Sequence, residues 1–178
     1  MHPLLEQFTK TAHQALASSP GPAGRQQVCE ALSELLRNES FIQEYVDGFT
    51  EERNKVYEDP ELGFCVLVHH YAGAKSSSPH DHAHSWAIYG QARGETLMTD
   101  YSLVSAPSGD QPGKVKPIKS YSLKPGDVHL YNEGVLHAPE RVDSTRLIRI
   151  EGVDMKTVKR SAFEVHSLNA NEARGEWT

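Results

Sequence analysis

Three histidines at alternate positions, His80, His82 and His84, follow a Gly/Ser-rich run and precede an apolar stretch typical of a β-strand. In a β-strand, residues two positions apart point to the same face. Two imidazoles at this spacing can therefore reach one metal ion at the roughly 2.0–2.2 Å usual for metal–nitrogen bonds. The spacing alone allows a metal site on β-structure.

From about residue 55 onward, the chain reads as short strands separated by turns. Segments rich in β-branched and aromatic residues predict strands at about 55–58, 64–71, 85–91, 95–103, 115–123, 127–132 and 146–151. Turns rich in Gly, Pro, Ser or Asp separate most of them, and residues 105–113 predict an exposed loop. Many short strands of this kind favour a sandwich or barrel over a βαβ fold.

The first 50 residues have a different pattern, that of amphipathic helices. Apolar residues recur at helical spacing over about 3–18 and 24–37, with the breaker Ser-Pro-Gly-Pro at 19–22 between them. A further turn or two is expected over 41–46. We therefore predict N-terminal helices within residues 1–50, a β-barrel over 51–168 and a polar tail at 169–178, as one structural domain.

Charge and composition narrow the class of protein. The formal net charge of −6 argues against a general binder of nucleic acid or anionic membranes. No apolar run approaches the roughly 20 residues of a membrane span, and no signal peptide is evident. Two cysteines, Cys29 and Cys65, are too few for a disulfide framework and are expected to be small buried side chains. These features predict a cytoplasmic protein.

A second histidine motif lies downstream, and the two motifs together resemble those of the cupin superfamily, small β-barrels built as a double-stranded β-helix. The first cupin motif is His-x-His, three or four residues, Glu, six residues, Gly. It fits His80, His82 and Gly94, whereas its Glu position falls on Ala87.

The second cupin motif is Gly, five residues, Pro-x-Gly, two residues, His, three residues, Asn. It fits Gly126, Gly134 and His137. Asn132 takes the place of the Pro, and Arg141 takes the place of the Asn.

The resemblance implies that His80, His82 and His137 hold a metal ion. With Ala87 in the Glu position, the ligands form a neutral three-histidine face, which suits Fe(II) and leaves coordination positions open. Zinc or nickel is an alternative in the purified protein. His84 is expected to be a neighbour of the site or an exposed loop residue.

Within the cupins, the chain resembles the cysteine dioxygenase branch of thiol dioxygenases. The run SSPHDH at 77–82, the spacing to Gly94 and two N-terminal helices are similar to that family. So is Arg53, at the place where the family has an arginine that binds the substrate carboxylate. Two features depart from it: Ala87 cannot form the family's Cys–Tyr crosslink, and its Ser-His-Tyr relay would fall near Leu147, Arg149 and Glu151.

The resemblance implies an iron-dependent dioxygenase that converts a small carboxylated thiol, such as cysteine or 3-mercaptopropionate, to its sulfinic acid. Tyr89, expected to share a face with Ala87, is a candidate hydrogen-bond donor to oxygen. Arg149 is an alternative carboxylate anchor, or pairs with a neighbouring glutamate. Arg53, Tyr71 and Ala87 are candidates for the substrate site, although Tyr71 could instead be a core residue.

Two other functions stay open at this point. One is a different metal-dependent cupin enzyme, such as a carbon–carbon-cleaving dioxygenase or an isomerase, and the other is a non-catalytic cupin that binds metal or a small ligand. The position of Arg53 tests the thiol dioxygenase hypothesis: a place in the metal cavity favours a carboxylated substrate, and a place facing solvent removes the main support beyond the histidines. The expected partners are a small thiol and O2, with no nucleic acid or membrane, and the resemblance also allows a homodimer.

Overall fold

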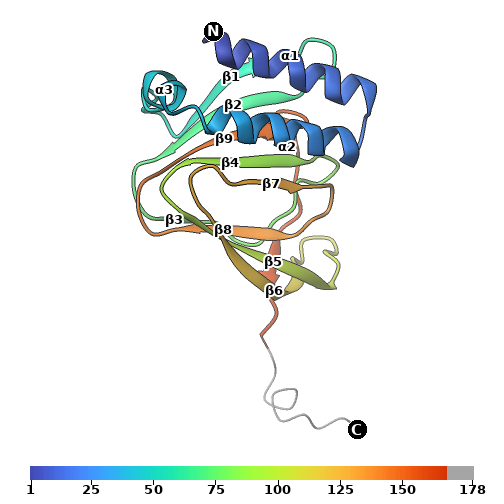
Figure 1. Ribbon diagram of the computed structural model, residues 1–178. Coiled ribbons are helices and arrows are strands. Elements are labelled where there is room, and N and C mark those ends of the chain that lie inside the picture. The colour runs from blue at the N-terminus through green and yellow to red at the C-terminus, as the bar shows by residue number, and fades with distance from the viewer. Residues whose placement is uncertain (168–178) are drawn as a thin grey trace, which may run out of the picture.

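The computed structural model describes residues 1–167 and contains two five-stranded sheets that curl around one another, with helices outside one of them (Figure 1). The helices are α1 (Pro3–Ser18), α2 (Pro22–Leu36) and α3 (Glu39–Phe41), followed by a π-helical turn (Ile42–Val46) and, near the end, a 3-10 turn (Met155–Thr157). The strands are β1 (Arg53–Glu58), β2 (Cys65–Tyr71), β3 (Lys75–Ser76), β4 (Ala87–Arg93), β5 (Thr96–Ser105), β6 (Gly113–Leu123), β7 (Val128–Tyr131), β8 (His137–Arg141), β9 (Thr145–Glu151) and β10 (Phe163–Val165).

The strand order identifies the fold as a double-stranded β-helix. One sheet has the order β1-β2-β9-β4-β7 and the other the order β10-β6-β5-β8-β3. Consecutive strands repeatedly cross between the sheets: β4 lies in the first sheet and β5 in the second, and β7, β8 and β9 alternate in the same way. All pairings are antiparallel except that of β10 with β6. The predicted all-β core with N-terminal helices is confirmed.

Local sequence sets the ends of the two long helices. The ring Nδ1 of His2 accepts a hydrogen bond from the backbone N–H of Leu4, and Pro3 occupies the first helical position, where a missing N–H costs nothing. A proline also begins α2, after Gly21 with a φ of 123°. The segment between the helices is short, so α1 and α2 lie antiparallel on one sheet (Figure 1).

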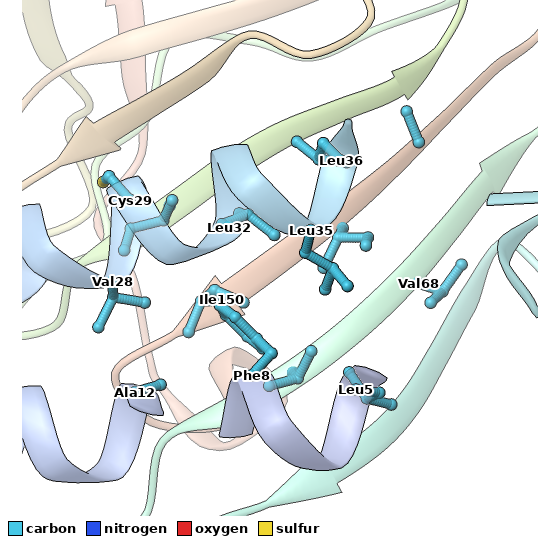
Figure 2. Packing of buried hydrophobic residues seen from close by; sticks show 14 of the residues in the cluster. Leu5, Phe8, Ala12, Val28, Cys29, Leu32, Leu35, Leu36, Val68 and Ile150 are labelled. Atoms are coloured by element: carbon cyan, nitrogen blue, oxygen red, sulfur yellow. The ribbon is translucent and has the colours of Figure 1, made fainter. Parts of the chain in front are cut away.

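The main apolar core lies between these helices and the outer face of the first sheet (Figure 2). Leu5 and Phe8 of α1 and Leu32 of α2 are at most 4 % exposed, and they pack with Val68 of β2 and Ile150 of β9. Because side chains alternate along a strand, the residues between these apolar ones point into the barrel. The barrel interior can therefore carry other chemistry.

The sequence predicted the long elements well and the short ones poorly. Both long helices and seven strands are found near their expected positions, and Cys29 and Cys65 are free and buried. Strands β3, β8 and β10 were not predicted, because each has five residues or fewer and is defined by its pairing partner. The predicted tail at 169–178 lies outside the described residues. Within residues 1–167, no helix is long and apolar enough to cross a membrane.

Gly94 allows the chain to turn from the first sheet into the second, so a substitution at this position tests the fold. It lies between β4 and β5 with a φ of 68°, and a Cβ there would collide with the carbonyl oxygen of Ser144. We expect Gly94→Ala to lower the free energy of unfolding by about 2–4 kcal/mol, from backbone strain and overpacking together, in urea denaturation.

Two other glycines provide matched controls. Gly63 has a similar φ of 74° but open space around its Cβ position, so Gly63→Ala should cost only about 1 kcal/mol. Gly73 has open space and no positive φ, so Gly73→Ala should be close to neutral. An equal loss of stability at Gly94 and Gly63 would contradict the predicted steric contribution.

Candidate metal centre and adjoining cavity

A pair of backbone hydrogen bonds brings two of the predicted metal ligands together. The N–H of His80 donates to the carbonyl of His137, and the N–H of His137 donates to the carbonyl of His80, both at 2.9 Å. His137 is the first residue of β8, so this isolated bridge joins the histidine loop to the second sheet. The two imidazole rings lie 4.6 Å apart between centroids.

A tight turn, and not a strand, directs His82 to the same point. Residues 81–86 form no strand, so the prediction that alternation along a strand aligns the histidines is wrong. Instead, the Asp81 carboxylate accepts a hydrogen bond from the N–H of Ala83 at 3.0 Å, and Ala83 adopts a φ of 53°. The turn buries His82 completely and leaves His84 exposed. Of the two expectations for His84, the exposed loop position is therefore the one found.

The three imidazoles form a group that can hold one metal ion. One ligand atom from each of His80, His82 and His137 lies within 4.8 Å of the others. The Nδ1 atoms of His80 and His137 lie 2.9 Å and 3.0 Å from the carbonyl oxygens of Ser78 and Val135. Because a carbonyl only accepts, each Nδ1 carries the proton and each Nε2 keeps its lone pair. This is the tautomer that a metal ligand requires.

Burial also keeps these histidines in the charge state that binds metal. It lowers the pKa of His80 to about 4 and that of His137 to about 2, and it lowers the pKa of His82 as well. All three imidazoles are therefore neutral at pH 7. A neutral three-nitrogen donor set fits a divalent ion such as iron, zinc or nickel.

Tyr89 lies where it can contact a ligand of that ion. Its hydroxyl is 3.3 Å from Nε2 of His82 and 3.4 Å from Nε2 of His137. Burial raises the pKa of Tyr89, so the hydroxyl keeps its proton at neutral pH and can donate it in a hydrogen bond. The guanidinium carbon of Arg149 lies 4.9 Å from the centre of the Tyr89 ring.

Sequence reasoning missed a second tyrosine that packs on the centre. The ring of Tyr131 stacks on His137 with centroids 3.9 Å apart and an angle of 19° between planes. Its hydroxyl is 2.7 Å from that of Tyr121, which donates to Asp100 at 3.0 Å. Tyr131 pairs in register with Ala87, so interior alternation along β7 is the signal that could have identified it.

A cavity of about 500 Å³ adjoins the metal centre at His80 and Tyr89. Tyr71 lines this cavity. No aspartate or glutamate is among the described residues that line it. Its four basic side chains are Lys75, Arg141, Arg149 and Arg160. The charge of the lining therefore favours an anionic ligand.

Arg149 both lines the cavity and neighbours Glu151. Its Nε lies 3.1 Å from Oε1 of Glu151, but the N–H is not aligned for a hydrogen bond. Its Nη2 has no hydrogen-bond partner in the described part of the chain. Glu151 is instead held by Arg53 at 3.0 Å and by the N–H of Met155 at 2.9 Å. Arg149 thus keeps N–H groups available for a ligand.

Arg53 and Ala87, the other predicted substrate contacts, do not line this cavity. Arg53 faces neither the cavity nor open solvent: its side chain is 20 % exposed and pairs with Glu151 and, at 2.8 Å, with Asp154. Ala87 is fully buried in a small cluster inside the barrel that includes Tyr131. Of the predicted substrate residues, only Tyr71 is part of the cavity wall.

Arg141, which the sequence marked only as a departure from the second motif, is a buried charge without a counterion. It is 5 % exposed, and its guanidinium lies 4.2 Å above the ring of Tyr71. No carboxylate pairs with it in the described part of the chain. Burying an ion costs several kcal/mol, whereas a desolvated cation–π contact returns about 2 kcal/mol. A bound anion in the cavity would supply the missing stabilisation.

Comparisons with known proteins find weak structural similarity and no sequence match. No family model matches the sequence, and no curated protein does. Among solved structures, a cupin superfamily protein from Desulfitobacterium hafniense DCB-2 is similar with a TM-score of 0.45 and 14 % identity, over 62 % of this chain and 88 % of that one.

Two further solved structures are similar in the same way. A double-stranded β-helix protein from Klebsiella pneumoniae has a TM-score of 0.44 and 16 % identity, over 69 % of this chain and 88 % of that one. An oxalate oxidase in complex with the substrate analogue glycolate has a TM-score of 0.36 and 21 % identity, over 51 % of this chain and 41 % of that one. At these identities the likeness concerns the fold alone.

The geometry predicts that metal binding depends on His82 and not on its neighbour His84. His82→Ala removes one of the three proposed ligands and should lower the affinity for Fe(II) or Zn(II) by at least about 100-fold, given that even residues that only orient a ligand contribute about 10–100-fold. His84→Ala, which changes an exposed imidazole, should leave the affinity unchanged. Metal content after loading and desalting, measured by mass spectrometry, checks both. Equal metal content in the two variants would contradict the site.

A buried histidine beside the cavity predicts an acid-sensitive fold. Burial, together with the positive charges of Arg149, Arg53 and Arg141, lowers the pKa of His69 to about 3. Unfolding restores a value near 6.5, so the unfolded chain binds the extra proton. Stability should therefore fall as the pH drops below about 6.5, by about 2–3 kcal/mol at pH 4.5 from this residue.

The variant His69→Phe tests this pH dependence, because it keeps a ring to stack on Tyr71 but cannot take up a proton. Between pH 7 and pH 4.5, its free energy of unfolding should fall by about 2–3 kcal/mol less than that of the wild type. Urea denaturation at the two pH values measures the difference. Any constant effect of losing the Tyr71–His69 hydrogen bond cancels when the free energies at the two pH values are subtracted. An identical pH dependence in both proteins would disprove the role of His69.

Proposed function

We propose that this protein is a non-haem iron-dependent dioxygenase that oxidises a small carboxylated thiol to its sulfinic acid. The observation that carries the proposal is the neutral histidine triad beside a cavity whose lining is basic. The cavity leaves room for a substrate next to the ion, which favours an enzyme over a protein that only binds metal. The resemblance of the two histidine motifs to the thiol dioxygenases supports the choice of reaction.

Each residue of the centre then has a defined task. His80, His82 and His137 would hold Fe(II), which supplies the redox chemistry for combining the thiolate with O2. Both oxygen atoms are transferred to sulfur, so R–S⁻ and O2 give R–SO2⁻ with no further oxidant or reductant. The positive charge of the lining favours the thiolate over the thiol.

Arg149 and Tyr89 position the reactants in this scheme. Arg149 offers its free N–H groups to the substrate carboxylate, a charge-assisted contact for which a guanidinium is well shaped. It takes this role in place of Arg53, because Arg149 lines the cavity, whereas Arg53 does not line it and pairs with both Glu151 and Asp154. The Tyr89 hydroxyl lies 3.3 Å and 3.4 Å from the Nε2 atoms of two ligands, so it would offer a hydrogen bond to oxygen beside the metal.

The test is oxygen consumption by the Fe(II)-loaded protein with cysteine, 3-mercaptopropionate and cysteamine, which lacks a carboxylate. We expect thiol-dependent uptake with one O2 per thiol, a product carrying two added oxygen atoms by mass spectrometry, and no activity in His82→Ala. Arg149→Met should lower kcat/KM for the carboxylated thiol about 10–100-fold, the equivalent of one charge-assisted hydrogen bond, and should leave cysteamine turnover almost unchanged.

Arg53→Met is the matched control, since it removes an arginine that does not line the cavity. Its effect on kcat/KM for the carboxylated thiol should be smaller than that of Arg149→Met. The reverse order would assign the carboxylate to Arg53. An iron-loaded protein without thiol-dependent oxygen uptake across the panel would rule out the proposed reaction.

A further inference from the structure

We propose that the cavity selects a substrate with two carboxylates, the first bound by Arg149 and the second by Arg141. This inference rests on the proposed function and names the substrate class of the same site. It goes beyond a simple carboxylated thiol, for which one arginine would be enough. The evidence lies in the pairing, placement and surroundings of the basic side chains.

Only some of the four cations are free to bind an anion. Lys75 forms an ion pair with Glu52, and Arg160 is exposed, so water already stabilises its charge and an anion adds little. Arg141 is both buried and without a carboxylate partner in the described part of the chain, although it lines the cavity. Arg149 lies 3.1 Å from Glu151 through its Nε, but its Nη2 has no hydrogen-bond partner there. These two guanidinium groups are therefore the ones that a ligand would satisfy.

The two arginines come from different sheets and lie on different aromatic rings. Arg149 is on β9 in the first sheet, and Arg141 is on β8 in the second. Each guanidinium rests on a different ring, Arg149 on Tyr89 and Arg141 on Tyr71. A planar guanidinium on an aromatic ring has a fixed orientation and presents its N–H edge to a carboxylate. Two such guanidinium groups in one cavity could bind the two carboxylates of one molecule.

The size of the cavity agrees with a larger ligand than a three-carbon thiol. Its volume is about 500 Å³, within the range of pockets that take whole small molecules. A second anionic group also fits the absence of acidic side chains from the described lining. Such a group would contact Arg141 and leave the thiol and first carboxylate where the proposed reaction needs them.

The test compares two thiols that differ by one carboxylate, mercaptosuccinate and 3-mercaptopropionate. Their binding to the full-length protein as purified is measured by titration calorimetry under nitrogen, so that no oxygen chemistry occurs. We expect mercaptosuccinate to bind at least tenfold more tightly, which corresponds to about 1.4 kcal/mol. Arg141→Met should abolish this preference while changing the affinity for 3-mercaptopropionate less than twofold.

Two further variants separate a specific contact from general effects. Arg37→Met removes an exposed positive charge that is not part of the cavity lining and should keep the preference. Arg141→Lys keeps the charge but loses the two-pronged contact, so it should show an intermediate preference. Arg141→Met should also not lower the thermal midpoint of the ligand-free protein, because it removes a charge that has no counterion.

Equal affinities of the wild type for the two thiols would overturn the inference, as would a preference that survives in Arg141→Met. An equal loss of both affinities in Arg141→Met would overturn it too, since that result indicates a structural role. These outcomes are independent of the proposed reaction. A protein that prefers mercaptosuccinate but consumes no oxygen would disprove the oxidation alone, and one that oxidises both thiols after binding them equally would disprove only the second carboxylate site.

Discussion

The packing of α1 and α2 on the outer face of the first sheet is the interaction on which the rest of the structure depends. In a small barrel the interior usually has to supply the apolar core. Here Leu5, Phe8 and Leu32 bury the outer face of β2, β4 and β9 instead. Hydrophobic burial scales with apolar area removed from water, wherever that area lies. The barrel interior is thereby free to hold histidines, tyrosines and arginines.

Strand β9 shows how one sequence serves both faces. Ile148 and Ile150 point to the helices, and Arg149 and Glu151 point into the barrel. A shift of register by one residue would exchange these faces and place the charges in the apolar layer. The apolar core outside therefore fixes the orientation of the charged residues inside. For this reason the position of Arg149 beside Tyr89 is a consequence of the isoleucines on either side of it.

The same dependence explains what the sequence could and could not predict. The grouping of His80, His82 and His137 was predictable because the two motifs that the chain resembles contain them. The choice between Arg53 and Arg149 was not, since it depends on which carboxylates the long-range pairing of β1, β2 and β9 brings near each guanidinium. Arg141 stands out in the sequence only as a mismatch, because its missing counterion is visible only once the strands are paired.

The neutral histidine group and the basic side chains of the adjoining cavity both favour an anionic ligand. Three uncharged imidazoles would leave both positive charges of a divalent ion uncompensated in a buried site, where the effective dielectric constant is low. Arg141 adds a further buried positive charge, and no carboxylate in the described part of the chain pairs with it. A thiolate with one carboxylate would compensate only part of this charge. A thiolate with two carboxylates would compensate more of this positive charge. The uncompensated charge that would favour the proposed anionic thiol would therefore favour a dicarboxylate thiol still more.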